Sequence, residues 1–109
     1  FNKKSFNKER YGTMMNVIGI DVSKKKLDCV LLCSSKPEKE LYKKAANTPA
    51  GFQSLIDWCI KKAKCEPHEI HAVMEATGPY HEACALALFE ADFKVSIVNP
   101  AKIKHFPIA

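Results

Sequence analysis

Three stretches in the first half of the chain have the hydrophobic patterns of β-strands. Residues 16–21 ("NVIGID") are apolar on both faces, which is typical of a central strand that is covered above and below. Residues 26–33 form a second apolar run after a link short enough for a hairpin, so the two strands are expected to be antiparallel neighbours. Residues 40–47 are more polar, and their charges are typical of an edge strand.

The next stretch has the helical period instead. Thr48 is expected to be the N-cap and Pro49 the first helical residue, because both residue types favour these positions. Apolar residues then recur at spacings that place them on one helical face: Phe52, Leu55, Ile56, Cys59, Ile60 and Ala63. Trp58 falls outside this stripe and is expected to cover a margin of the sheet, with contact to a partner as the alternative.

Strands and helices alternate in the second half of the chain. Residues 69–77 and 93–99 have strand patterns, and residues 78–91 between them have a helical pattern with Pro79 close to the first turn. Residues 100–106 are expected to begin a third helix. Three opening strands followed by this alternation predict the α/β class, with a mixed five-stranded sheet and helices on its faces.

Composition supports one domain in a reducing, aqueous compartment. The 109 residues are 47% hydrophobic and 27% charged, as in ordinary globular proteins, and no apolar run approaches the roughly 20 residues of a membrane span. Residues 1–13 are basic and lack the features of a secretory signal, so a cytoplasmic location is expected. They are interpreted as a disordered or non-native tail before a domain over residues 14–109. The five cysteines contain no C-x-x-C pair, and free cysteines of this kind behave as small hydrophobic residues.

Two carboxylates stand in otherwise apolar strand patterns. Asp21 ends the first strand and Glu75 lies near the end of the fourth, and an ionised group in a buried strand costs roughly several kcal/mol unless it is compensated. If these strands are parallel neighbours, their carboxyl ends meet at the edge where α/β sheets bind ligands. Mg²⁺ would relieve the repulsion between the two acids, and paired ions suit phosphodiester cleavage. Partial solvation, or pairing with the lysines at 24–26, is the alternative.

Two segments of the chain resemble a known family. "IGIDVSKKKLD" and "MEATGPYHEACALALFEADFKVSIVNPAKIKHF" resemble the N-terminal domain of the DEDD-type insertion-sequence transposases, a family that also contains the Piv site-specific DNA invertases. The match runs roughly from Val17 to Phe106. The resemblance implies a ribonuclease H-like, RuvC-like fold with strand order 3-2-1-4-5. It also implies that Asp21 and Glu75 are the first two acids of a catalytic tetrad, and that both bind Mg²⁺.

The resemblance also implies partners and a truncation. DNA is the expected substrate, a structured guide RNA is a further expected partner, and the full-length protein is expected to form a homo-oligomer. The third and fourth acids of the family, and its serine-bearing C-terminal domain, have no counterpart before Ala109. The chain is therefore expected to be a truncated product or an excised domain that does not cleave DNA by itself.

Five other residues are candidates for nucleic-acid contact. Thr77 and Gly78 could present helix amides to a phosphate, or could simply form a turn and cap. Tyr80 could stack on a base or pack in the first helical turn. Lys102 and Lys104 could touch a nucleic-acid backbone or remain solvated.

Two other classes of function fit parts of the pattern. An actin-like sugar kinase or ATPase also begins with three strands and a helix, but it would normally carry a glycine and Ser/Thr cluster after Asp21, and "DVSKKK" has no glycine. A non-catalytic remnant that only binds nucleic acid is the remaining alternative.

Overall fold

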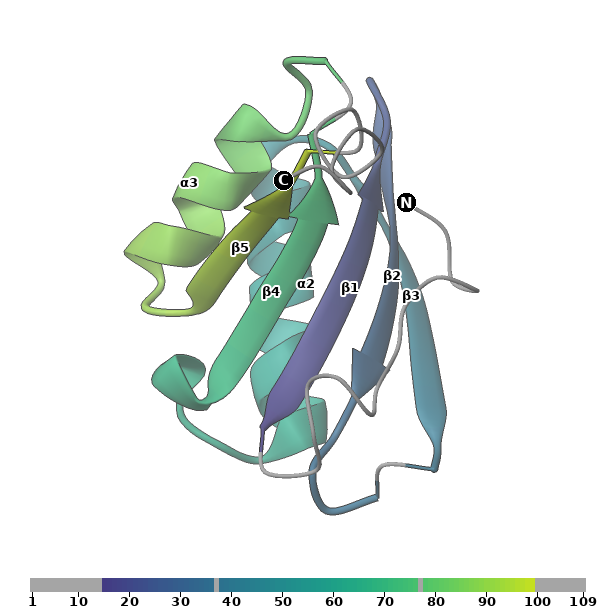
Figure 1. Ribbon diagram of the computed structural model, residues 1–109, viewed down its shortest axis with the longest axis vertical. Helices are drawn as coiled ribbons and strands as arrows, with labels where there is room; N and C mark the ends of the chain where they lie inside the picture. Colours follow the sequence, from purple (N-terminus) through teal and green to yellow (C-terminus); the bar gives the residue numbers. More distant parts are fainter. Residues whose placement is uncertain (1–14, 37, 77, 100–109) are drawn as a thin grey trace, which may run out of the picture.

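The computed structural model describes residues 15–36, 38–76 and 78–99, and Figure 1 shows their arrangement around one five-stranded sheet. The elements, in chain order, are β1 (Asn16–Val22), β2 (Lys26–Leu32), β3 (Glu40–Ala46), α2 (Pro49–Ala63), the 3-10 turn η2 (Pro67–Glu69), β4 (Ile70–Glu75), α3 (Glu82–Glu90) and β5 (Lys94–Val98). The predicted tail at 1–13 and the predicted third helix at 100–106 lie outside the described residues.

The sheet has the predicted order, β3-β2-β1-β4-β5. β1 pairs with β2 and β2 pairs with β3 in antiparallel fashion, whereas β1 with β4 and β4 with β5 are parallel. The predicted mixed sheet and its central strand are therefore confirmed. β1, β3, β4 and β5 all end, and β2 begins, at one edge of the sheet, which is called the carboxyl rim below (Figure 1).

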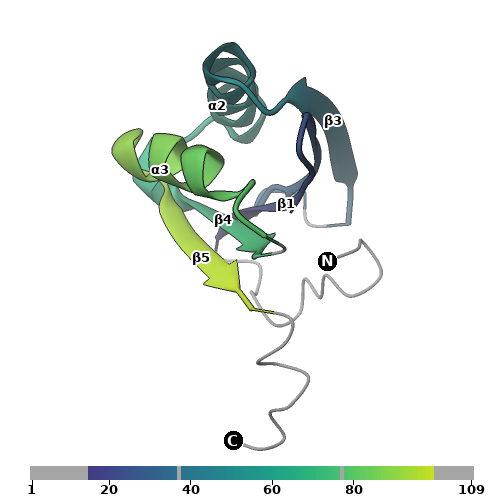
Figure 2. The same cartoon turned by 90° about the horizontal axis from the view of Figure 1, so that it is seen from above.

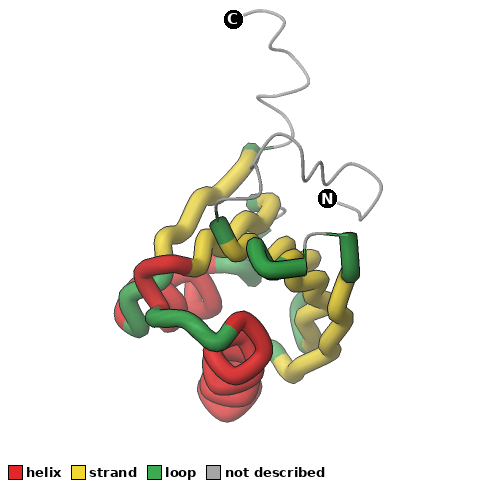
Figure 3. The backbone as a smooth tube through the Cα atoms, turned by 90° about the horizontal axis from the view of Figure 1, so that it is seen from below, coloured by secondary structure: helices red, strands yellow, loops and turns green. Residues whose placement is uncertain are grey.

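Both described helices cover the same face of the sheet, as Figures 2 and 3 show from above and below. Alternate side chains of the strands point toward α2 and α3 and form the core, including Ile18, Ile20 and Met74, which are fully buried. Leu55 and Cys59 on α2 are equally buried, so the predicted apolar stripe of this helix is the one that packs on the sheet.

The start of α2 follows the predicted signals. Pro49 is the first helical residue, and the Oγ1 atom of Thr48 accepts a hydrogen bond of 3.1 Å from the backbone N–H of Gly51. This cap satisfies one of the amide groups that a helix leaves unpaired at its first turn. Trp58 packs against the margin of the core, with the Nζ atom of Lys43 5.9 Å from its ring centroid, so the margin interpretation is confirmed.

The second helix begins later than predicted. α3 starts at Glu82 because residues 78–81 form a turn, in which Gly78 has a positive φ of 94° and the N–H of Glu82 bonds to the carbonyl of Pro79 at 3.2 Å. The first hydrogen bond of α-helical spacing runs from Ala85 to His81. The chain therefore changes direction between β4 and α3 instead of entering the helix directly.

Cys29, Cys33 and Cys59 lie in the core as their strand and helix positions indicate, whereas Cys65 is only partly buried. Cys29, Cys33, Cys59 and Cys84 are buried free thiols, and burial raises the pKa of both Cys29 and Cys84 to about 12. Such thiols remain protonated near neutral pH and act as packing groups. Of the two described helices, neither is long and apolar enough to cross a lipid bilayer.

Candidate active site

Asp21 lies at the carboxyl rim on the face of the sheet that α2 and α3 leave uncovered. It is the sixth of the seven residues of β1, and it is exposed although its two neighbours in the strand are buried. Side chains alternate across a strand, so Asp21 points away from the helices that bury Ile20 and Val22. The expectation that this carboxylate carries a burial cost is therefore wrong, because it stands in water and needs no compensating partner for its charge.

Glu75 lies beside Asp21 on the neighbouring strand. It is the last residue of β4 and is half-buried. The parallel pairing of β1 with β4 ends at Ile20 opposite Met74, and one further step in this register sets Asp21 alongside Glu75. The structure thus places Asp21 and Glu75 at one rim and on one face of the sheet. This is the arrangement expected if their strands are parallel neighbours.

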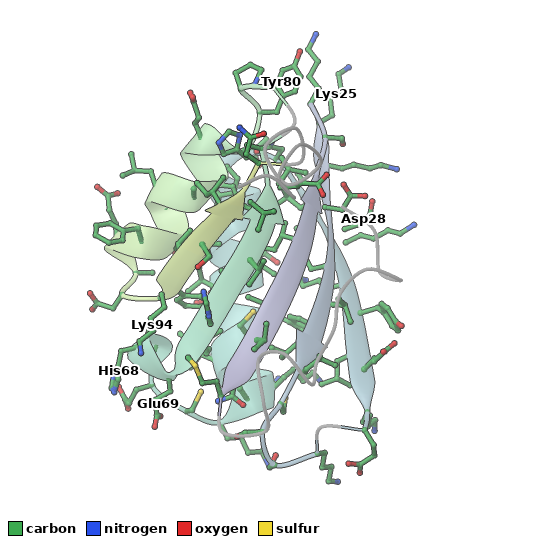
Figure 4. The ribbon with its side chains drawn as sticks, viewed as in Figure 1. Lys25, Asp28, His68, Glu69, Tyr80 and Lys94 are labelled. Atoms are coloured by element: carbon green, nitrogen blue, oxygen red, sulfur yellow. The ribbon has the colours of Figure 1, made fainter. Side chains whose placement is uncertain are left out.

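A third carboxylate, Asp28, joins this row and was missed by the sequence analysis. Asp28 pairs directly with Asp21 across the β1–β2 hairpin, and Lys44 pairs with Asp28 from β3. Figure 4 shows Asp28 near the same end of the sheet as Lys25 and Tyr80. The register of the hairpin produces this pairing, because Val22 opposite Leu27 places Asp28 opposite Asp21.

The segments around the two predicted acids are tied together by Asn47. Its side-chain amide donates to the carbonyl of Ser23 at 2.8 Å and to the carbonyl of Tyr80 at 3.0 Å. Its backbone N–H donates to the carbonyl of Lys25 at 2.9 Å. The β1–β2 turn, which follows Asp21, and the β4–α3 loop, which follows Glu75, are therefore held to the end of β3 by one side chain.

Replacing Asn47 by Ala should lower the free energy of unfolding by about 1–2 kcal/mol. Two side-chain hydrogen bonds are lost, and each contributes about 1 kcal/mol net. Urea denaturation measures the loss, and faster amide hydrogen exchange at residues 23–26 locates it. The matched control is Gln53→Ala, which removes an exposed bond of 2.9 Å to Asp57 within α2 and should cost less than about 0.5 kcal/mol. Equal losses in the two variants would contradict the tying role of Asn47.

Of the five candidates for nucleic-acid contact, the structure describes Gly78 and Tyr80. Gly78 and Tyr80 are exposed at the carboxyl rim, where the carbonyl of Tyr80 accepts the bond from Asn47. Gly78 lies in the turn that precedes α3, which agrees with the turn alternative for this residue rather than with a helix N-terminus. Thr77, Lys102 and Lys104 lie outside the described residues.

His68 and His71 lie away from the acids, whereas His81 lies in the turn at 78–81, where its Nδ1 atom is 3.0 Å from the carbonyl oxygen of Gly78. His71 is near the start of β4, and its Nε2 atom lies 2.6 Å from the Oγ atom of Ser96. Burial, followed by the charge of Lys94, lowers the pKa of His71. Figure 4 places His68 and Glu69 at the same distant end of the sheet, so neither His68 nor His71 joins the carboxyl rim.

The carboxyl rim carries the donor atoms that a hard divalent cation prefers. Asp21, Asp28 and Glu75 supply only carboxylate oxygens, and Mg²⁺ in proteins is typically held by one or two carboxylates, with water and substrate phosphate as its other ligands. Among the described residues, no three His, Cys, Asp or Glu side chains converge as a closed metal site.

Sequence comparison identifies relatives over most of the chain. A profile of the DEDD-type insertion-sequence transposases, described as "Transposase", matches residues 18–108. The "Pilin gene-inverting protein" of Moraxella bovis is 33% identical over 89 residues, which are 82% of this chain and 26% of that protein. The protein of the same description from Moraxella lacunata is 32% identical over 89 residues, which are 82% of this chain and 26% of that protein. The chain thus spans about a quarter of the length of these relatives.

Solved structures share the fold at low identity. RuvC from T. thermophilus, in complex with a Holliday junction substrate, superposes with a TM-score of 0.53 at 15% identity, over 87% of this chain and 71% of that chain. YeaZ from Pseudomonas aeruginosa superposes with a TM-score of 0.50 at 12% identity, over 86% and 51%. The RuvC likeness and the strand order confirm the predicted ribonuclease H-like fold. Together with the profile match over residues 18–108, this shows that the chain belongs to the family of DEDD-type transposases.

Proposed function

We propose that this chain is the amino-terminal part of the catalytic domain of a Mg²⁺-dependent DNA recombinase that cleaves and joins strands during transposition. The observation that carries the proposal is the register that aligns Asp21 with Glu75 at the carboxyl rim. The family supports the reaction class, and the relatives are named for inverting a gene segment. DNA is the proposed substrate, while a guide RNA and a homo-oligomeric assembly are proposed for the full-length protein.

The proposed mechanism assigns a role to each acid. Asp21 on β1 and Glu75 on β4 would hold Mg²⁺ at the carboxyl rim, on the face of the sheet opposite α2 and α3. A metal ion held there would supply Lewis-acid stabilisation of the charge that develops on the phosphoryl group. Asp21 is hydrated in the free protein, so it exchanges water for metal without leaving a buried environment. Asp28 adds negative charge beside Asp21 and thereby increases the attraction of the site for a cation.

We further propose that the chain does not cleave DNA alone. Two aligned carboxylates supply part of the ligand set that two metal ions require, and the family is named for four acids. The isolated chain then binds a divalent ion weakly and without the geometry for strand cleavage.

The metal site is tested by adding Mn²⁺ to the isotope-labelled chain and recording amide line broadening by NMR. Broadening should be strongest for residues 21, 28 and 75, because a paramagnetic ion affects the nuclei nearest to it. It should disappear in Asp21→Asn, while added Mg²⁺ should compete with it in the wild-type chain.

A second acidic cluster in the chain provides an internal control for this experiment. Glu66 and Glu69 form an exposed acidic pair around η2, beside His68, at the opposite end of the sheet (Figure 4). Broadening that centres on η2, or that persists unchanged in Asp21→Asn, would contradict the proposed site. Glu69→Gln serves as the matched control and should leave the broadening at the carboxyl rim unchanged.

A further inference from the structure

The turn between β1 and β2 carries three consecutive lysines that no proposed step uses. Lys24, Lys25 and Lys26 are all exposed, and they follow Asp21 by three to five positions. They are called the lysine turn below. At about 3.3 Å per residue, the backbone of Lys24 lies within roughly 10 Å of Asp21. Lysine side chains are long, so those of the lysine turn come within reach of a phosphate next to one held at Asp21.

The backbone of the lysine turn is fixed by hydrogen bonds. The N–H of Ser23 donates to the carbonyl of Lys26 at 2.9 Å, and the hydroxyl of Ser23 donates to the same carbonyl at 3.0 Å. Asn47 donates to the carbonyls of Ser23 and Lys25 from the side of β3. Because these bonds order the turn before binding, a ligand need only immobilise the three side chains, which lowers the entropic cost of binding.

The lysine turn also offsets the negative charge of the carboxyl rim. Asp21, Asp28 and Glu75 place three acidic groups in one row, and this row would repel a DNA strand that approaches without compensation. The lysine turn adds three positive charges at the same edge, and Lys44 adds another beside Asp28. Figure 4 shows Lys25 and Tyr80 together at this end of the sheet, and the bonds of Asn47 confirm that their segments adjoin.

We propose that Lys24, Lys25 and Lys26 bind the phosphate backbone of the DNA strand next to the phosphate that Asp21 and Glu75 act on. The inference rests on the proposed function, since it takes DNA as the substrate. Lysine is suited to this task because it contacts phosphate as a compact charge without reading sequence. The lysine turn therefore sets affinity and the position of the strand, and not the choice of target sequence.

The test is the salt dependence of DNA binding, measured by fluorescence anisotropy of a labelled duplex in EDTA. The variant replaces all three lysines of the turn by Ala. Each phosphate contact contributes about 0.9 to the slope of log K against log salt, so the slope should become shallower by up to about 2.7. The affinity at low salt should fall about tenfold or more.

The matched control replaces Lys61, Lys62 and Lys64 by Ala. The substitutions remove the same charge, and all three lysines are exposed. These lysines lie at the end of α2, where the carbonyl of Lys62 accepts a 3.8 Å hydrogen bond from the thiol of Cys33, next to the far end of β2. The control should leave the slope within about 0.5 of the wild-type value. Circular dichroism establishes that both triple variants are folded.

The following outcomes separate this inference from the proposed function. A loss confined to the lysine turn supports the inference. Equal losses in both triple variants, or no loss in either, overturn it, while Mn²⁺ broadening at residues 21 and 75 can still support the metal site. A loss for an RNA of equal length without a loss for DNA also overturns it. If the lysine turn binds DNA but the broadening is absent, DNA binding by the lysine turn is supported and the proposed metal site fails.

Discussion

A full-length recombinase that carries this domain should lose DNA strand cleavage when Asp21 is replaced by Asn. The substitution keeps the size of the side chain and removes the charge that we propose holds Mg²⁺ at the carboxyl rim. Metal ions contribute several kcal/mol of transition-state stabilisation in phosphodiester cleavage, and about 4 kcal/mol corresponds to roughly 10³-fold in rate. We therefore expect a loss of at least roughly 10³-fold in single-turnover cleavage of a labelled DNA substrate in Mg²⁺.

Glu75→Gln should have an effect of similar size, and the double variant should be no slower than either single one. Groups that act as a unit lose their joint contribution when one of them is removed, so their effects do not add. Independent structural roles would instead give additive losses. The control is Glu69→Gln, which removes an acid at the opposite end of the sheet and should leave the rate within about twofold. Cleavage by Asp21→Asn within tenfold of the wild-type rate would contradict the assignment.

The elements of the fold could be predicted from local patterns. The strands at 16–22 and 26–32 and the helix at 49–63 were found almost to the residue, because alternating or helical hydrophobic periods mark buried faces directly. The start of α3 was misplaced, because the turn at 78–81 is held by hydrogen bonds that no periodicity reveals. Pro79 is expected close to the first helical turn, and in the structure its carbonyl closes the turn before the helix by accepting from the N–H of Glu82.

The candidate site could be predicted in part. Asp21 and Glu75 stood out as lone acids in apolar strands, and the parallel pairing of β1 with β4 aligns them as required. The reason given for Asp21 was nevertheless wrong, because an apolar neighbourhood in sequence was taken for a buried one in space, and alternation turns this residue outward. Asp28 and Asn47 were missed because their importance comes from cross-strand register and from long-range hydrogen bonds, which single-sequence patterns do not encode.

Replacing Gly51 should destabilise the domain through a direct clash with the backbone. It lies in the first turn of α2 and is buried against the end of β3. A Cβ atom built on Gly51 would lie 1.8 Å from the carbonyl oxygen of Ala46 and 2.7 Å from its carbonyl carbon. Both are backbone atoms, so no side-chain rotation relieves the clash. Either α2 or the end of β3 must move.

Gly51→Ala should therefore lower the free energy of unfolding by about 3 kcal/mol, as measured by urea denaturation. The sign is diagnostic, because the same change at an unobstructed helical position stabilises a protein by up to about 1 kcal/mol. Ser54→Ala on the exposed side of the same helix is the control and should change stability by less than about 0.5 kcal/mol. A neutral or stabilising Gly51→Ala would show that α2 does not approach β3 this closely.

The same substitution should also reach the candidate site. Ala46 directly precedes Asn47, whose bonds to Ser23 and Tyr80 hold the segments that follow Asp21 and Glu75. A shift of the β3 end by even a few tenths of an ångström lengthens these bonds. In Gly51→Ala, amide exchange at residues 23–26 should therefore accelerate more than exchange in the middle of β4. If exchange accelerates uniformly instead, the loss is global and the end of β3 does not support the carboxyl rim.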